Sequence, residues 1–323
     1  MEEKNKYSIL MSVYYKDREE WLKQSIESML NQTIKTDDFV IIKDGKLTKE
    51  LEEIINTYKE KEPNIFNIIQ LEENKGLGIA LSIGIKECKN EWIARMDSDD
   101  ISMPNRVEKQ MKIINKQDID IIGSNIAEFI ADINNVQAYK KMPETDCDIK
   151  KYAKRRNPFA HPSEMLKKDK ILESGNFRDY YLCEDYDMWL RMIKNNAKCY
   201  NIQENLVYMR VNQDFYKKRG GIKYLKSILK LKTEQYRIGF FSLTDYALTS
   251  LASIIICLLP NKIRETFYKK FLRKWKYEKM VKNDAKKDKV SVIVRSNGIE
   301  QQKGKNRNFL NEEYLLNGEQ CIF

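Results

Sequence analysis

Short apolar runs alternate with amphipathic segments in the amino-terminal part of the chain. The runs are rich in strand-forming residues and predict strands at residues 7–13, 39–42, 65–71, 92–96 and 119–123. The segments between them carry apolar residues at helical spacing, and the first does so at Leu22, Ile26, Met29 and Leu30. Strands separated by helices predict an α/β fold in which a mostly parallel sheet is covered on both faces.

Two of the predicted helices are preceded by residues that suit a first turn. Asp17 can cap the helix after the first strand, because Glu20 follows closely enough to reach back to it. Ser102 can cap the helix after the fourth strand, where Pro104 lies near the first turn. Both helices are therefore expected to begin at a capping side chain.

Polar and aromatic residues stand at the carboxyl ends of the predicted strands. They are Ser12, Tyr14 and Tyr15, then Asp44, then the segment 74–78, and then Asp97, Ser98 and Asp99. In a parallel sheet these ends meet at one edge, where ligands bind. A tyrosine can stack on a nucleobase, a carboxylate can accept from its ring N–H, and paired carboxylates can hold a divalent ion between two phosphates. The set predicts a nucleotide site, although each residue alone also fits an ordinary turn.

The composition narrows the class of protein. Of 323 residues, 42% are hydrophobic and 33% charged, with 12 Gly and 6 Pro, which excludes collagen-like and low-complexity chains. The single histidine, His161, excludes a metal site built from several imidazoles, so any metal must bind oxygen ligands. The 6 cysteines form no CxxC pair, and the amino terminus has no signal-peptide pattern. These features predict a protein of the reducing cytoplasm.

Positive charge is concentrated towards the carboxyl terminus. Residues 217–289 hold 20 Lys and Arg against 6 Asp and Glu, a net charge of +14, whereas the other 38 Lys and Arg and 42 Asp and Glu give −4. Residues 246–260 hold no charge and would rise about 22 Å as a helix, too short for the roughly 30 Å hydrocarbon core. After them, apolar residues recur every fourth position among lysines and arginines, at Ile263, Phe267, Phe271 and Trp275.

This pattern predicts an amphipathic helical region that lies on an anionic membrane surface. The alternative is a helical subdomain that packs on the body of the protein and exposes a solvated basic face. A nucleic-acid partner is not expected, because the apolar stretch would then stay exposed. We therefore divide the chain into a body at 1–212, a basic helical region at 213–281 and a polar tail at 282–323, in which residues 290–294 could add a strand.

Seven sequence blocks, taken in order, resemble one known family. They are residues 9–14, 25–33, 41–45, 74–78, 92–106 with its acids Asp97 to Asp100, 161–163 and 184–189. They resemble the inverting glycosyltransferases of family 2, which have the GT-A fold and are often found in bacterial capsule and lipopolysaccharide assembly. The resemblance extends over about residues 7–210.

The resemblance implies four roles for the matching residues. Ser12, Tyr14 and Asp44 would hold the uracil of a UDP-sugar, Asp97 would lie against the ribose, Asp99 would bind Mg²⁺ or Mn²⁺, and Asp185 would be the catalytic base. Lys43 departs from the family pattern, because many members carry an acid there, so recognition of the base would rest on Asp44 alone.

Three further residues receive less weight. His161 lies between prolines that favour an extended loop. It could line the acceptor pocket, bind near the diphosphate or serve a structural role. Glu184 accompanies Asp185, and both could instead be the solvated acidic start of a helix. Arg106 suits a structural or ion-pairing role at the acid loop better than catalysis.

The sequence therefore predicts a metal-dependent inverting glycosyltransferase. It would move a sugar from a nucleotide donor, with UDP favoured, to a glycan or lipid-linked acceptor in bacterial surface polysaccharide biosynthesis, at the inner face of the cell membrane. The alternatives are a nucleotide-sugar-binding module without turnover, and a basic membrane-surface or RNA-binding protein whose acids are incidental. The donor sugar, the acceptor and the linkage depend on loop shape rather than on motifs.

Overall fold

The structure is a computed structural model that describes residues 5–211 and 218–267, all of them within the unit Met1–Trp275. Several sequence predictions lie outside these residues: the apolar positions Phe271 and Trp275, the strand at 290–294 and the polar tail at 282–323.

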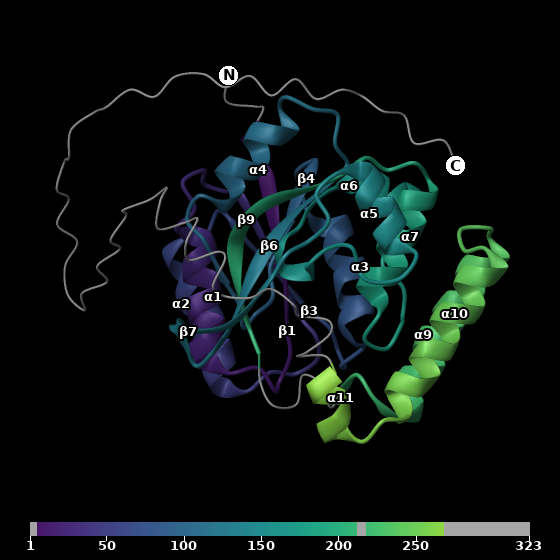
Figure 1. Ribbon diagram of the computed structural model, residues 1–323. Helices are drawn as coiled ribbons and strands as arrows, with labels where there is room; N and C mark the ends of the chain where they lie inside the picture. The colour runs from purple at the N-terminus through teal and green to yellow at the C-terminus, as the bar shows by residue number, and fades with distance from the viewer. Residues whose placement is uncertain (1–4, 212–217, 268–323) are drawn as a thin grey trace. The chain divides into compact units, whose positions relative to one another are not determined.

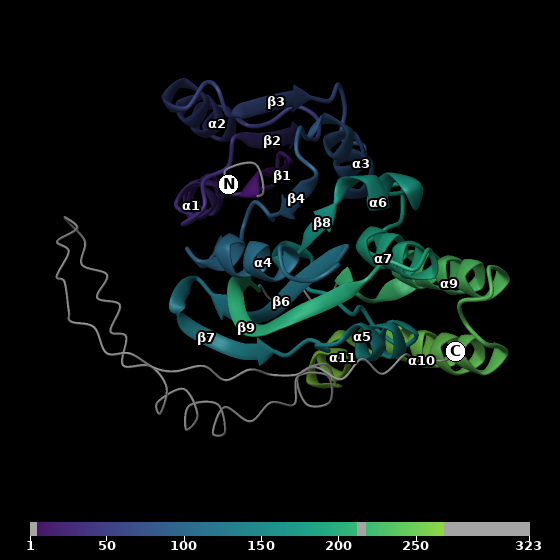
Figure 2. The same cartoon turned by 90° about the horizontal axis from the view of Figure 1, so that it is seen from above.

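A mixed sheet forms the centre of the described residues (Figures 1 and 2). Its strands are β1 (Tyr7–Val13), β2 (Asp38–Lys43), β3 (Phe66–Gln70), β4 (Trp92–Arg95), β5 (Ile101–Ser102), β6 (Ile121–Ile130), β7 (Asp132–Lys140), β8 (Met165–Lys167) and β9 (Cys199–Arg210). The order is β3-β2-β1-β4-β8-β6-β9-β5, and β7 pairs with β6. The pairs within β1 to β4 are parallel, as is β6 with β9, whereas β5, β7 and β8 run antiparallel to their neighbours.

Helices cover both faces of this sheet, as predicted. One face carries α1 (Glu19–Leu30), α2 (Lys49–Lys61) and α4 (Arg106–Ile114), and the other carries α3 (Leu77–Glu87), α5 (Asp146–Ala153), α6 (Lys168–Glu173) and α7 (Glu184–Lys194). Figure 1 shows α1 and α2 on one side of the strands and α3, α5 and α7 on the other. Each face has its own hydrophobic core: the first core lies under α1, α2 and α4, and the second lies under α3, α5, α6 and α7. Successive side chains of a strand point to opposite faces, so Ile9 and Met11 lie in the first core and Leu10 lies in the second.

The predicted strands correspond to β1 to β4 and β6, whereas β5, β7, β8 and β9 were not predicted, although β9 runs parallel to β6. The first four predicted strands match β1 to β4 within one residue at each end. The fifth was predicted at 119–123, and β6 begins two residues later and continues to Ile130. The missed strands β5 and β8 have 2 and 3 residues, β7 has no buried position, and β9 mixes buried and less buried positions without strict alternation. Their places depend on partners far along the chain, which a local apolar pattern does not report.

Both predicted helix caps are wrong. The N-cap of α1 is Arg18, with no side-chain cap, because the Asp17 carboxylate accepts from Ser98 instead. The N-cap of α4 is Asn105, and Ser102 lies in β5, where its hydroxyl accepts from the Gln32 amide. In both cases a tertiary hydrogen bond takes the side chain that local spacing assigned to the helix.

A helical pair, α9 (Gly221–Arg237) and α10 (Leu243–Leu258), precedes the short α11 (Asn261–Phe267). Ile228 and Leu231 of α9 belong to the second core, and the buried Lys232 donates to the Ser253 hydroxyl of α10 at 2.6 Å. Among the residues that the structure describes, none of the helices is both long and apolar enough to cross a bilayer. The division of the chain at residue 212 stays a prediction, although α9 shares a core with the body.

Candidate active site

The acids after β4 form a crowded loop at the edge of the sheet. The Asp97 side chain is 30% exposed and pairs with Arg95, whose side chain is 2% exposed. Burial alone would raise the pKa of Asp97, but the Arg95 guanidinium holds the pKa below its usual range. Asp97 is therefore a fixed negative charge at neutral pH.

Asp99 stands in an excess of negative charge. Burial, together with the charges of Asp97 and Asp17, raises the pKa of Asp99 to about 7. A divalent cation would relieve this repulsion, and one or two carboxylates plus diphosphate oxygens are a usual ligand set for Mg²⁺. Residues 5–211 and 218–267 hold no group of three or more His, Cys, Asp or Glu side chains arranged for a metal ion. The acids therefore fit a cation that takes its remaining ligands from a bound diphosphate and water.

The end of β1 meets this acid loop. Tyr14 follows β1, and its ring makes an edge contact with Tyr15 at 5.8 Å between centroids. Burial raises the pKa of the Tyr14 hydroxyl, and the Asp17 and Asp99 carboxylates raise it further. Ser12 is half-buried in β1 one strand away from the acid loop. The structure therefore brings the two predicted nucleobase residues of β1 to the same sheet edge as the acids.

Asp44 holds the loop that follows β3. Its two carboxylate oxygens accept from the N–H groups of Lys75 at 2.7 Å and Gly76 at 3.0 Å, and the residue is 3% exposed. Each oxygen keeps a second lone pair, so a nucleobase ring N–H could share one. The adjacent Gly45 has φ +86°, and a Cβ there would lie 2.7 Å from the Asn74 nitrogen. Glycine is therefore required where these two loops meet.

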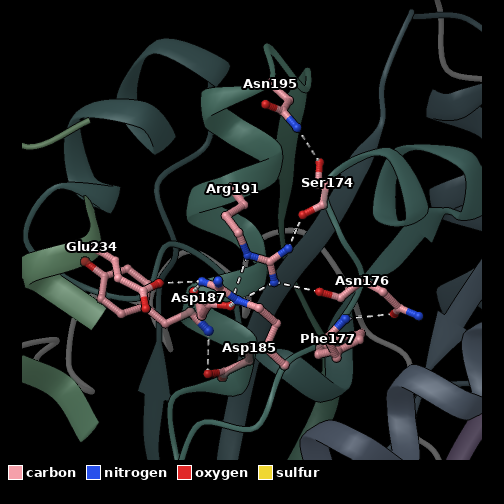
Figure 3. A network of polar contacts seen from close by, with 10 residues as sticks. Ser174, Asn176, Phe177, Asp185, Asp187, Arg191, Asn195 and Glu234 are labelled. Carbon is pink, nitrogen blue, oxygen red and sulfur yellow. Dashed lines mark hydrogen bonds and ion pairs between the residues drawn. The ribbon is translucent and has the colours of Figure 1, made fainter. Parts of the chain in front are cut away.

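Three acids, Glu184, Asp185 and Asp187, lie in the first turn of α7. Figure 3 shows Asp185 and Asp187, which have different partners. Asp187 is fully buried and accepts from Arg178 Nε at 2.9 Å and from Arg191 Nη2 at 2.8 Å. Figure 3 shows that Arg191 also reaches the loop before α7, so Asp187 anchors that loop to the helix. Asp185 is only partly buried, and it accepts from the Tyr186 N–H at 2.6 Å.

Glu184 and Asp185 both hold their protons to higher pH than ordinary acids. Burial raises the pKa of Glu184 to about 8, with the Asp185 charge adding to the effect. Burial raises the pKa of Asp185 to about 6, although the bond from Tyr186 opposes it. Both groups interact with Asp97, so the first turn of α7 lies near the acid loop. Asp185 is thus ionised at pH 7, more basic than an ordinary aspartate, and also bonded to its own helix.

His161 lies in a buried layer behind these acids. It begins a 3₁₀ turn, η2 (His161–Ser163), and not the extended stretch that the prolines predicted. Burial lowers the pKa of His161 to about 3, so the imidazole is neutral. Its Nε2 is 3.6 Å from Glu164 Oε1, and Glu164 accepts from Trp189 Nε1 at 2.6 Å. This setting favours a supporting role for His161.

Arg106 is fully buried at the start of α4. Its Nη2 donates to the carbonyl oxygens of Arg95 and Glu164, both at 2.9 Å, and its Nε donates to Gln110 Oε1 at 3.1 Å. Burial lowers the pKa of the guanidinium to about 10. These acceptors favour the structural alternative over the ion-pairing one.

Several polar residues near this edge were not among the predicted site residues. They are Asp17, Arg95, Glu164 and Arg210. Arg95 stands two positions before Asp97, and the period of a strand could have indicated that the two share a face. Arg210 ends β9 and donates to the Asp99 carbonyl at 2.9 Å, a contact that no local pattern signals.

Comparison with known proteins identifies the family of this chain. Residues 8–175 match the family model described as Glycosyl transferase family 2. The chain is 37% identical to the "UDP-Gal:alpha-D-GlcNAc-diphosphoundecaprenol beta-1,3-galactosyltransferase" of Escherichia coli, over 84% of this chain and 98% of that relative. It is 32% identical to the amylovoran biosynthesis glycosyltransferase AmsE of Erwinia amylovora, over 82% of this chain and 98% of the relative.

Solved structures show the same fold at low sequence identity. Residues 1–349 of S. aureus TarS in complex with UDP-GlcNAc superpose with a TM-score of 0.58 at 14% identity, over 83% of this chain and 71% of that one. The mannosyltransferase PcManGT from Pyrobaculum calidifontis, in complex with GDP-Man and Mn²⁺, gives 0.55 at 12% identity, over 80% and 71%. With the family match over more than half of its length, the chain belongs to glycosyl transferase family 2 and has the GT-A fold.

Proposed function

We propose that this glycosyltransferase moves a sugar from UDP to a lipid-linked or glycan acceptor with inversion, and that Asp185 is the catalytic base. The contrast within α7 carries the proposal. Asp187 is committed to two arginines, whereas Asp185 is partly exposed and burial raises its pKa to about 6. A general base needs a carboxylate that is ionised near neutral pH and can still accept a proton.

In the proposed step the acceptor hydroxyl oxygen attacks the anomeric carbon from the face opposite the nucleotide. The new C–O bond forms while the bond from that carbon to the diphosphate oxygen breaks, and the electron pair leaves with UDP. Asp185 takes the hydroxyl proton. Attack from the opposite face turns an α-linked donor into a β-linked product, and the name of the E. coli relative specifies a β linkage, which supports this outcome.

The proposed donor site uses the residues at the strand ends. Ser12, Tyr14 and Asp44 take the nucleobase, Asp97 takes the ribose, and Asp99 holds Mg²⁺ or Mn²⁺. When bound, such a cation neutralises the charge that grows on the departing diphosphate. UDP is supported by the UDP-Gal in the name of the E. coli relative and by the UDP-GlcNAc complex of TarS, and a divalent cation by the Mn²⁺ complex of PcManGT.

Asp185→Asn tests the assignment of the base. The variant keeps the shape of the side chain but cannot take a proton, so we expect kcat for UDP-sugar transfer to fall by about 10²- to 10⁴-fold. The affinity for UDP should stay within about threefold of the wild type, because the nucleotide does not need the base. Transfer to a synthetic lipid-diphosphate acceptor and calorimetric titration of UDP provide the two measurements.

A matched control is Asp179→Asn, an exposed acid on the loop before α7. It should leave kcat unchanged. Equal kcat in Asp185→Asn and Asp179→Asn would contradict the assignment. UDP binding by wild-type protein that transfers no sugar to any acceptor would instead favour a binding module without turnover.

We further propose that residues 213–281 bring the body, residues 1–212, to the cytoplasmic face of an anionic membrane. The supporting observation is an apolar face on α10, where Leu248, Leu251, Ile255 and Leu258 are 53–69% exposed. Residues 217–289, which include α10, carry the net charge of +14, which suits anionic lipid. The diphosphoundecaprenol acceptor in the name of the E. coli relative supports a substrate that lies in such a membrane.

Leu251→Glu tests this membrane contact. The variant places a charge at the centre of the apolar face of α10, where the wild type would bury one leucine side chain in lipid. The loss of that burial weakens membrane binding by about 1.5–3 kcal/mol. We expect about tenfold or greater loss of cosedimentation with vesicles that contain phosphatidylglycerol. Leu172→Glu on α6, where the leucine is 40% exposed, is the control and should bind as the wild type does. A wild-type dimer that Leu251→Glu dissociates, without vesicle binding, would assign the face to a second copy of the chain.

A further inference from the structure

One carboxylate oxygen joins the loop after β1 to the loop after β4. Asp17 Oδ2 accepts from the backbone N–H of Tyr14 at 3.1 Å and from the Ser98 hydroxyl at 2.8 Å. Tyr14 lies at the proposed nucleobase end of the donor site, and Ser98 stands between the two acids of the diphosphate end. The bond from Ser98 spans 81 positions of the sequence and is a tertiary contact. The bond from Tyr14 lies within a turn, in which the Asp17 N–H also donates to the Tyr14 carbonyl oxygen at 3.0 Å.

The position of Asp17 does not serve the helix that follows it. The N-cap of α1 is Arg18, and no side chain caps that end. Among the described residues Asp17 forms no ion pair within 4 Å; the charges of Asp97 and Asp99 repel it, and the more distant charge of Lys218 attracts it. Burial of a carboxylate beside other acids is electrostatically unfavourable, and the two hydrogen bonds to Asp17 offset part of that cost.

We infer that Asp17 is a positioning residue that fixes the spacing between the nucleobase end and the diphosphate end of the donor site. This inference rests on the proposed function. A sugar nucleotide is held at both ends at once, so its affinity depends on two loops that are already at the right separation. If the link between the loops is removed, each end can still be bound, but the loops must be ordered when the whole nucleotide binds.

The geometry predicts how substitutions differ. Both hydrogen bonds reach the same oxygen, so Asp17→Asn can keep both with its amide oxygen while it loses the charge. Asp17→Ala loses both bonds. Ser98→Ala loses the link between the loops and leaves the bond to Tyr14, and Ser98→Thr restores the hydroxyl. A residue that acts through its charge would instead fail equally as Asn and as Ala.

The test is calorimetric titration of the full-length protein with uridine, and with UDP in the presence of Mn²⁺. We expect Asp17→Ala and Ser98→Ala each to weaken UDP binding by about 5- to 10-fold, as the loss of one hydrogen-bonded link between the loops predicts. Ser98→Ala should bind uridine as the wild type does. Asp17→Asn and Ser98→Thr should restore UDP affinity to within about threefold, and the double alanine variant should be no weaker than Asp17→Ala.

Three results would overturn the inference. The first is wild-type UDP affinity in Ser98→Ala, a variant that removes only one hydroxyl and should fold even where Asp17→Ala does not. The second is an Asp17→Asn variant as weak as Asp17→Ala, which would assign the effect to charge. The third is additive losses in the double variant. Glu19→Ala, an exposed acid in the first turn of α1, is the control and should not change affinity. Wild-type protein that binds no UDP would overturn the proposed function together with this inference.

Discussion

At the scale of single residues, the buried charges of the site are held by partners that stand close to them. Arg95 pairs with Asp97 two positions later, while Arg106 supports the same strand end by donating to the Arg95 carbonyl. Because the Arg95 side chain is 2% exposed, water has little access to this position and could not solvate the Asp97 charge from there if Arg95 were removed. The pair therefore fixes both the charge and the position of one acid in the proposed donor site.

Arg95→Met tests the weight of this pair. The variant leaves Asp97 without its cation in a largely buried place, so we expect a loss of about 3 kcal/mol in the free energy of unfolding. Urea denaturation measures the loss. Lys198→Met breaks the exposed pair with Asp118 and should cost less than about 1 kcal/mol. A larger loss in Lys198→Met than in Arg95→Met would contradict the role of Arg95.

At the scale of elements, the site forms where α3 and α7 approach each other. A Cβ at Gly78 of α3 would lie 2.3 Å from the carbonyl oxygen of Arg178 and 3.2 Å from the Cβ of Glu184. The first of these neighbours is backbone, which cannot swing aside. The glycine therefore sets how closely α3 packs against the loop and first turn that carry the proposed base.

Gly78→Ala should force this contact apart. We expect the free energy of unfolding to fall by about 1–3 kcal/mol, as in other overpacked sites, and transferase activity to fall with it, because the first turn of α7 must move. Ser82→Ala on the same helix is the comparison and should change stability by less than about 0.5 kcal/mol. Unchanged stability and activity in Gly78→Ala would show that the loop before α7 can move away from α3 without a loss in the free energy of unfolding, which would contradict this role of Gly78.

Elements also show why sequence patterns found only part of the site. The parallel strands β1, β2 and β4 are apolar runs, so the residues at their ends, such as Tyr14, Asp44 and Asp97, could be named in advance. The late strand β9 has no such pattern, and its last residue, Arg210, reaches Asp99 only through the sheet order. Local periodicity reports burial along one element and not which elements become neighbours.

At the scale of the whole molecule, the two acids at the start of α7 whose pKa burial raises, Glu184 and the proposed base Asp185, lower the stability of the fold at neutral pH. Burial raises the pKa of Glu184 to about 8 and of Asp185 to about 6. The folded state therefore holds protons that the unfolded state has released between about pH 5 and pH 8. Stability is highest at the acid end of this window and falls as the pH rises through the raised pKa values.

This linkage predicts a measurable slope. The free energy of unfolding of the ligand-free protein should fall by up to about 1.4 kcal/mol per pH unit for each proton that only the folded state retains. Glu184→Gln removes the group with the larger pKa shift of the two and should make the free energy of unfolding depend less steeply on pH. Denaturant titrations about one pH unit apart, from about pH 5.5 to about pH 7.5, measure this dependence. Glu53→Gln, at an exposed position of α2, should leave the slope as it is. If the free energy of unfolding of the wild type instead rose with pH over this range, the burial of these acids would be contradicted.

The sequence by itself determined the alternation of strands and helices, the acids at the strand ends and the concentration of positive charge towards the carboxyl terminus. These are local properties, since the period of an apolar pattern and the identity of neighbouring residues do not depend on distant contacts. Only the tertiary structure decided that Asp187 is bound by two arginines while Asp185 is not, and that Asp17 serves the acid loop and not a helix. The partner of a carboxylate depends on which distant segments the sheet order brings beside it, and one-dimensional spacing does not contain that information.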